Sequence, residues 1–374
     1  MPKPADKDVE VHLFGPGYGE SVLVHLGFND WLIVDSCVAR GSAVPAPTAY
    51  LEGIGVDPAI AVKLVVASHW HDDHVRGLSV VLKKCRSAEF WCSGALFGRD
   101  FLTLLSAVTK RPMTRAGTGL DEFRGVLDEL QARSLGKRMG GIGLKFAEAD
   151  KLLWQRTTPA DYAARVHSLS PSDAERLRSL QTIAGLVKGL KTPSRRPRGR
   201  VPSVRPNNTA VALHIQVGPA AVLLGADSEE IGKPPLQDCG WTAVVASARR
   251  PSERSTLFKV AHHGSETAHC ESVWTQMLEP KPLAILTPFR KGSVRLPTED
   301  DATRLRSRAT QLFITARHAT RRAKPGNPVV ARQFAQTARA VWEASAMGHI
   351  KAFIPEGKVN EGWTVATFSG AERL

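Results

Sequence analysis

Short apolar runs separated by turn residues characterise the first part of the chain. Each run has four to six residues, and the runs lie at 11–14, 21–26, 31–34 and 62–67. Glycines between the first two runs and Asn29-Asp30 before the third are typical of tight turns, so the pattern predicts successive antiparallel strands. The last run ends at a cluster of histidines, and the residues from 75 to 84 that follow predict a helix.

Helical periodicity replaces this pattern between residues 93 and 205. Helices are predicted at 99–108 and 120–133, and Ser172 with the acidic residues after it forms an N-cap and first turn for a third helix. Prolines and arginines crowd the stretch 191–200, which predicts an exposed basic loop. The helices of this segment either shape access to a site or form an interface between subunits.

Strand patterns return in the last part of the chain, at 210–215, 221–224, 258–261, 282–287 and 311–315. The chain thus divides into two β-rich parts, 1–92 and 206–374, separated by a mainly helical insertion, 93–205, that ends in the basic loop. Strands mixed with helices predict an α/β fold. We expect a four-layer αββα sandwich with the helical insertion over one edge.

Composition places the chain among ordinary globular proteins. Of its 374 residues, 43% are hydrophobic and 23% are charged, which is enough apolar material for a sizeable core. The N-terminus lacks the apolar run of a signal peptide, and no apolar stretch reaches the ~18 residues that a membrane helix requires. The five cysteines form no CxxC motif, which fits reduced thiols. We therefore expect a soluble cytoplasmic protein with no membrane partner.

The charge balance is strongly basic, with 50 lysines and arginines against 36 acidic residues and a net charge of +14. A surplus of this size attracts polyanions, nucleic acid first among them. A coding preference for arginine that leaves a solvated surface with no specific partner explains the charge equally well, so both interpretations stay open.

The candidate chemistry is concentrated in six residues directly after the strand predicted at 62–67. His69, His71, Asp73 and His74 lie there, and alternate residues in a turn leaving a strand project to the same side. His69 and His71 can therefore grip one cation together, while Asp73 and His74 face a second. Imidazole and carboxylate ligands suit zinc and, with more oxygen ligands, manganese.

Three further polar residues stand at the ends of predicted strands. Asp227 can bridge two metal ions, His263 offers one more imidazole, and Asp35 is placed to orient a ligand from behind. His262, beside His263, is either a proton donor and substrate contact or a buried hydrogen-bonded histidine.

The segment from His69 to His74 resembles the HxHxDH motif of the metallo-β-lactamase superfamily. Asp35, Asp227 and His263 are similar to its first-motif aspartate, its bridging aspartate and its last-motif histidine. This resemblance implies a metallo-β-lactamase sandwich with two divalent metal ions, zinc or manganese.

Three segments, 17–21, 207–210 and 259–265, more narrowly resemble the hydrolase domain of bacterial competence DNA-uptake channel proteins. The match covers roughly residues 9–92 and 205–315 and includes neither the membrane channel nor the helical insertion. Two positions depart from the wider pattern. Asn208 stands where the superfamily supplies a third-motif histidine, which leaves the first metal a weaker oxygen ligand, and Arg295 stands where competence-type domains carry a histidine.

A metal pair of this kind activates water for hydrolysis, with Asp73, His262 and Asn208 as the expected catalytic residues. The basic charge and the loop residues Arg195, Arg196, Arg198 and Arg200 favour a nucleic-acid phosphodiester as substrate. Hydrolysis of a small ester or lactone stays open, as does a nucleic-acid-binding or partner-dependent protein without turnover of its own. A protein partner or a homo-oligomer is also open.

Overall fold

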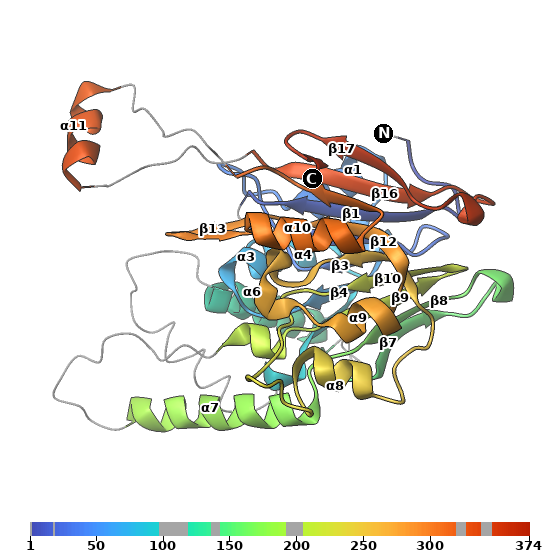
Figure 1. The fold of residues 1–374 in the computed structure, drawn as a ribbon, viewed down its shortest axis with the longest axis horizontal. Coiled ribbons are helices and arrows are strands. Elements are labelled where there is room, and N and C mark those ends of the chain that lie inside the picture. Colours follow the sequence, from blue (N-terminus) through green and yellow to red (C-terminus); the bar gives the residue numbers. More distant parts are fainter. Residues whose placement is uncertain are drawn as a thin grey trace.

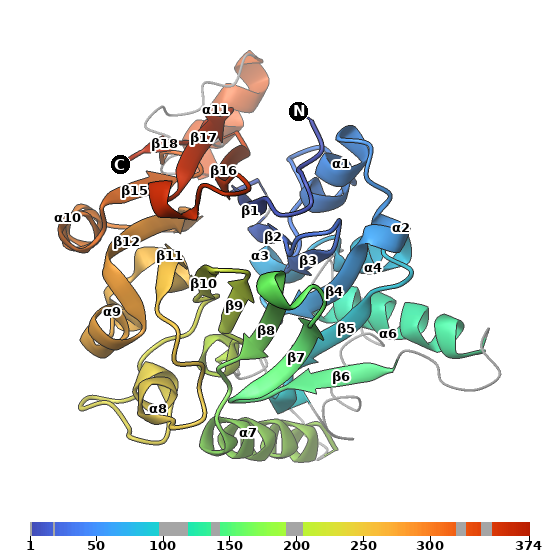
Figure 2. The same cartoon turned by 90° about the vertical axis from the view of Figure 1, so that its right-hand side faces the viewer.

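The computed structural model describes residues 2–17, 19–96, 119–135, 143–191, 205–318, 327–337 and 346–374. Two eight-stranded sheets pack face to face, and helices cover their outer faces (Figures 1 and 2). The predicted four-layer αββα sandwich is therefore confirmed. Among the described residues, no helix combines the length and apolar character that crossing a membrane requires.

The first sheet is built mainly from the first β-rich part. Its strand order is β17 (Thr364–Phe368), β16 (Gly348–Ile354), β1 (Val9–Gly15), β2 (Ser21–His25), β3 (Trp31–Val34), β4 (Val62–Ala67), β5 (Glu89–Ser93) and β6 (Leu144–Ala147). The strands from β17 to β3 are antiparallel, and those from β3 to β6 are parallel. Strand β16, from near the end of the sequence, pairs with β1 and so completes this sheet.

The second sheet is built mainly from the second β-rich part. Its order is β18 (Glu372–Arg373), β15 (Gln311–Ile314), β12 (Leu278–Leu286), β11 (Ser255–Lys259), β10 (Ala220–Leu224), β9 (Leu213–Val217), β8 (Ala164–Ser168) and β7 (Lys151–Arg156). Strands β10, β11, β12 and β15 run parallel to one another. A separate two-stranded hairpin joins β13 (Phe289–Lys291) to β14 (Val294–Leu296).

Three apolar clusters hold the layers together. The central one lies between the sheets and includes Val11 and Leu64 from the first sheet and Ile215 and Ile285 from the second. A second cluster packs the first sheet against α1 (Ala46–Gly53), α2 (Pro58–Ala61), α3 (Asp72–Val75), α4 (Leu78–Lys84), α6 (Gly119–Leu135) and α7 (Asp173–Lys191). The third packs the second sheet against α8 (Gly240–Ala246), α9 (Glu271–Gln276) and α10 (Glu299–Arg308). A further helix, α11, spans Pro328–Thr337.

The insertion, which the sequence predicts to be mainly helical, also contains three strands in its described residues. It contributes β6 to the edge of the first sheet and β7 and β8 to the edge of the second, so it extends both sheets. These strands are short and mix polar with apolar residues, and such a pattern gives a weak strand signal. The predicted helices at 120–133 and after Ser172 are confirmed as α6 and α7, whereas the one at 99–108 lies outside the described residues.

The helix predicted over 75–84 is divided in two. Gly77 adopts a φ of +85°, a left-handed conformation that ends the helical path between α3 and α4. The short α3 thereby carries Asp73 and His74 away from the end of β4, and α4 turns back to pack on the sheet.

Candidate metal centre

The candidate ligands gather at one edge of the sandwich, where parallel strands end. Strands β3 and β4 run parallel in the first sheet, and β10 and β11 run parallel in the second. The residues that follow these strands therefore emerge at the same edge of each sheet. Asp35 follows β3, the histidine cluster follows β4, Asp227 follows β10 and His263 follows β11.

Left-handed backbone turns aim these side chains into the site. Asp35, Ala226, His262 and His263 have φ values of +60°, +44°, +45° and +53°. Such conformations are costly for residues with a side chain and are retained where the surrounding structure requires them. The amide of His262 donates to the Ala226 carbonyl, 2.9 Å away, which ties the turn after β11 to the turn after β10.

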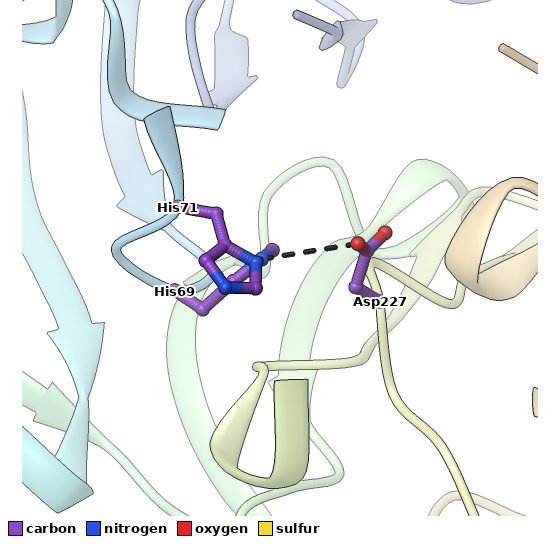
Figure 3. Close-up of side chains that lie close together, drawn as sticks. All are labelled: His69, His71 and Asp227. Carbon is purple, nitrogen blue, oxygen red and sulfur yellow. Dashed lines mark hydrogen bonds and ion pairs between the residues drawn. The ribbon is translucent and has the colours of Figure 1, made fainter. Parts of the chain in front are cut away.

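The first group of ligands consists of His69, His71 and Asp227. Nε2 of His69 lies 3.1 Å from Nδ1 of His71 and 3.9 Å from Oδ2 of Asp227. Figure 3 shows the two imidazoles and the carboxylate facing one another, with the histidines after β4 and the aspartate after β10. Both sheets thus contribute to one group, and each residue offers it one ligand atom.

The second group consists of Asp73, His74 and His263. Nε2 of His263 lies 3.6 Å from Oδ2 of Asp73 and 3.7 Å from Oδ2 of Asp227. Nε2 of His74 lies 3.4 Å from Oδ1 of Asp227. Asp227 therefore lies between the two groups, the position that the sequence predicts for a bridging carboxylate.

Three buried atoms at the centre of these groups have no hydrogen-bond partner among the described residues. They are Nε2 of His74, Oδ1 of Asp227 and Nε2 of His263. A buried polar atom without a partner is costly, and here three such atoms converge on one another. Ligand atoms of each group lie within 4.8 Å of one another, and imidazole with carboxylate is a donor set for divalent transition metals. The residues present therefore fit a metal ion.

Asp35 holds two of the ligands in place from behind. Nδ1 of His74 donates to Oδ2 of Asp35 at 2.7 Å, so Nε2 of the same ring faces Asp227. The hydroxyl of Ser68 donates to Asp35 at 2.6 Å and lies 3.0 Å from Nδ1 of His69. Because the Ser68 hydroxyl donates its hydrogen to Asp35, Nδ1 of His69 must be the donor in its contact with the Ser68 oxygen. Nε2 of His69 then carries no hydrogen and is an acceptor. This is the supporting role that the sequence predicts for Asp35.

The electrostatics of the site differ from one candidate ligand to the next. Burial lowers the pKa of His69 and His71, which keeps both imidazoles neutral. Burial opposes ionisation of Asp73 and Asp227, but neighbouring histidines lower the pKa of both carboxyls below the usual value. Burial likewise opposes a proton on His74 and His263, yet Asp227 and adjacent carboxylates raise their pKa. The protons on His74 and His263 balance the negative charge of the neighbouring carboxylates, as a bound divalent cation would.

Glu20 and Lys259 form a buried ion pair behind the ligands that the sequence analysis did not identify. The side chains are 3% and 1% exposed, and Nζ of Lys259 also donates to the Ala226 carbonyl at 3.1 Å. The Glu20 carboxylate lies 3.9 Å from Nδ1 of His74 and 3.7 Å from Nδ1 of His263. The position of Lys259 between the apolar residues Phe258 and Val260 was the available signal, because a buried lysine requires a partner.

His262 contacts Asn207 and Glu229 and is not part of either ligand group. Its Nε2 lies 3.2 Å from the Asn207 amide nitrogen, and its Nδ1 lies 2.5 Å from Oε1 of Glu229. The ring is partly exposed, at 20% of its side chain. Its partners hold it at the rim of the centre, so both the proton-donor and the hydrogen-bonded interpretations stay open.

Asn208 stands apart from the contact between Asn207 and His262. It belongs to the 3₁₀ turn Pro206–Thr209 and lines a hollow of about 270 Å³ that α7 residues Glu175, Arg178, Ser179 and Thr182 also line. His214 is buried in β9, where its Nε2 donates to the Glu253 carbonyl at 2.9 Å, so it is a packed histidine. The predicted nucleic-acid contacts Arg195, Arg196, Arg198 and Arg200 lie outside the described residues.

Two mixed sheets flanked by helices, with a histidine and aspartate cluster at the strand ends, give this chain the metallo-β-lactamase fold.

No protein-family model and no curated protein matches the chain. Similar solved structures include the metallo-β-lactamase fold protein YhfI from Bacillus subtilis, which is 13% identical with a TM-score of 0.38 and aligns over 82% of this chain and 95% of that one. The Rm3 metallo-β-lactamase is 15% identical, with a TM-score of 0.33 over 71% and 79% of the two chains. The E377D mutant of the CmlA β-hydroxylase is 12% identical, with a TM-score of 0.35 over 76% and 46%. At these values the likenesses concern the fold and carry no argument about activity.

Proposed function

We propose that this protein is a metal-dependent hydrolase and, more narrowly, a phosphodiesterase or nuclease. The observation that carries the proposal is the arrangement of six ligands in two groups around Asp227, with orphaned nitrogen and oxygen atoms turned toward one another. Two divalent ions, zinc or manganese, fit these donors. Bound there, they would activate a water and polarise the scissile group.

The exposed fractions of the candidate ligands indicate different roles for them. The side chains of His69, His74, Asp227 and His263 are at most 4% exposed, so they serve to hold the ions. The Asp73 carboxylate is 27% exposed, so solvent reaches it more readily than it reaches these four side chains. It is therefore placed to accept a hydrogen bond from the attacking water. His262, at the rim, can donate a proton to a leaving group.

A phosphodiester is favoured over other scissile groups by charge and by motif. The chain carries a net charge of +14, which attracts polyanions. The segments 17–21 and 259–265 resemble the hydrolase domain of competence DNA-uptake channel proteins, and they contain Glu20, Lys259 and His263, which meet behind the candidate centre.

Incubation of the purified protein with single- and double-stranded DNA and RNA, in the presence of manganese or zinc, tests the proposal. We expect cleavage that chelation stops and that His71→Ala and Asp73→Ala abolish. Asp72→Ala is the matched control, because this neighbouring carboxylate is exposed and belongs to neither ligand group. If the nucleic acids stay intact and esters or lactones are cleaved, the protein is a small-molecule hydrolase and not a nuclease. Salt-dependent nucleic-acid binding without turnover at any metal would indicate a binding protein instead.

A further inference from the structure

We propose that the hairpin formed by β13 and β14 is an arm that holds a nucleic-acid strand by its phosphates beside the metal centre. The inference rests on the proposed function because it assigns a polymeric phosphodiester to that same site. Three independent features of the hairpin support it: its attachment, its charge and its exposure.

The hairpin is attached directly to the ligand His263. The ring of Phe289, its first residue, stacks on the His263 imidazole with centroids 5.1 Å apart and planes inclined by 21°. Nδ1 of His263 donates to the carbonyl of Thr287, two residues before the hairpin, at 2.9 Å. Pro297, directly after the other strand, is buried against Gly264. Both ends of the hairpin thus flank the turn that carries His263.

The hairpin concentrates positive charge without any acidic residue. Arg290, Lys291 and Arg295 lie within the ten residues 288–297, which contain no aspartate or glutamate. Arg290 and Arg295 are direct partners in the antiparallel register. Like charges at such positions destabilise a hairpin, and an isolated two-stranded hairpin has little stability to spare. An anionic ligand that contacts both arginines would offset this repulsion.

The outer part of the hairpin is open to solvent. Lys291 and Arg295 are exposed, and Val294 is 49% exposed although it is apolar. Cations on either side of an apolar side chain suit a strand whose phosphates contact the charges while a sugar or base covers the valine. A small uncharged ester would use neither the charge nor the length of this arm.

The test compares two triple variants of the full chain with equal loss of charge. In the first, Arg290, Lys291 and Arg295 are changed to glutamine. In the control, Arg249, Arg254 and Lys358 are changed to glutamine; these exposed cations lie near the strand ends opposite the metal centre. Binding of labelled single-stranded DNA and RNA is measured by fluorescence anisotropy over a range of salt concentrations, with chelator present to prevent turnover. Arg290→Lys with Arg295→Lys keeps the charge and serves as the rescue.

We expect the hairpin variant to lose about tenfold or more in affinity and to lower the salt slope by about 2, since each phosphate contact contributes about 0.7 to 0.9 to it. The control and the lysine variant should stay close to the unmodified protein. Equal losses in both triple variants, or no binding of either nucleic acid by the unmodified protein at low salt, would overturn the inference.

The two proposals fail separately. If the hairpin variant cleaves nucleic acid with metal as well as the unmodified protein does, the proposed role of the hairpin is wrong and the proposed nuclease activity stands. Hairpin-dependent binding without cleavage at any metal overturns the nuclease and leaves the arm.

Discussion

The Asp35 carboxylate accepts a hydrogen bond of 2.7 Å from Nδ1 of His74 and thereby fixes which nitrogen of that ring faces Asp227. Asp35→Asn removes the charge that orients the imidazole while keeping its size. Because such supporting carboxylates typically contribute 10- to 100-fold to metal affinity, we expect a loss of about that size, measured by competition with a chromophoric chelator.

Asp57→Asn is the matched control for this substitution. Asp57 is an exposed N-cap of α2 whose side chain accepts from the Ala59 amide at 2.9 Å, and asparagine can replace it in that role. Metal affinity equal to that of the unmodified protein in both variants would show that Asp35 does not support the centre.

Gly19 is the position where a single methyl group should dismantle the site. A Cβ built on it would lie 1.9 Å from the Asp73 carbonyl oxygen, and its φ is +113°. Gly19→Ala must therefore displace the backbone of the ligand Asp73, and we expect loss of metal binding in calorimetric titration. Gly41→Ala is the control, since Gly41 has a φ of +79° but no atom within 4 Å of the added methyl. That variant should lose only about 1 kcal/mol of stability and bind metal normally. Normal metal binding by Gly19→Ala would show that the loop accommodates the methyl group.

The cluster of candidate ligands could be predicted from the sequence because its members lie in local motifs at the ends of strands. His69 to His74 are within six residues, and the strand before them is apolar apart from Lys63. The pairing of Glu20 with Lys259 joins positions 239 residues apart, and no local pattern reports such a contact. Strands β6, β7 and β8 were not predicted for a related reason, because pairing with neighbouring strands forms them rather than a periodicity of their own.

The neighbouring residues Asn207 and Asn208 show a further limit of prediction from the sequence. The sequence places Asn207 and Asn208 side by side, and counting back from Asp227 selects Asn208. In the structure Asn207 contacts His262, while Asn208 lines the hollow beside α7. Which of two adjacent side chains faces the site depends on the 3₁₀ turn that carries them, and spacing alone does not determine that turn.

The buried pair of Glu20 and Lys259 predicts a non-additive effect on stability. Lys259→Met leaves the Glu20 carboxylate buried without its partner, and breaking such a pair typically costs about 3–5 kcal/mol. Adding Glu20→Gln should recover a large part of this loss, because no uncompensated charge then remains. Urea unfolding of the two single variants and the double variant gives the coupling energy. Losses that simply add would show that the two charges do not stabilise each other.

Buried neutral histidines predict a loss of stability in mild acid. Burial lowers the pKa of His25 to about 4 and that of His349 to about 2, whereas in the unfolded chain each has a pKa of about 6.5. Below pH 6.5 the unfolded chain therefore binds protons that the folded chain does not. The resulting stability is fully present above pH 6.5 and falls as the pH drops toward each folded value.

We expect each of the two histidines to contribute a slope of about 1.4 kcal/mol per pH unit between pH 6 and 4.5. His25→Gln should reduce the slope of the unfolding free energy by about that amount, because glutamine does not titrate and can still donate to the Asp8 carbonyl as Nδ1 of His25 does at 2.8 Å. Urea unfolding at several pH values, with chelator present, measures this slope in the variant and in the unmodified protein. A slope that stays the same in the variant would mean that His25 is protonated in the folded protein.

The pairing of β1 with β16 also bears on when the protein can act. A chain leaving the ribosome presents His69 and His71 early, but the strand that borders β1 spans residues 348–354 and emerges long after them. Asp227 and His263, from the other sheet, follow long after the first histidines. The topology therefore prevents assembly of the centre until both halves of the sandwich have been synthesised, so a partly made chain lacks the complete set of candidate ligands.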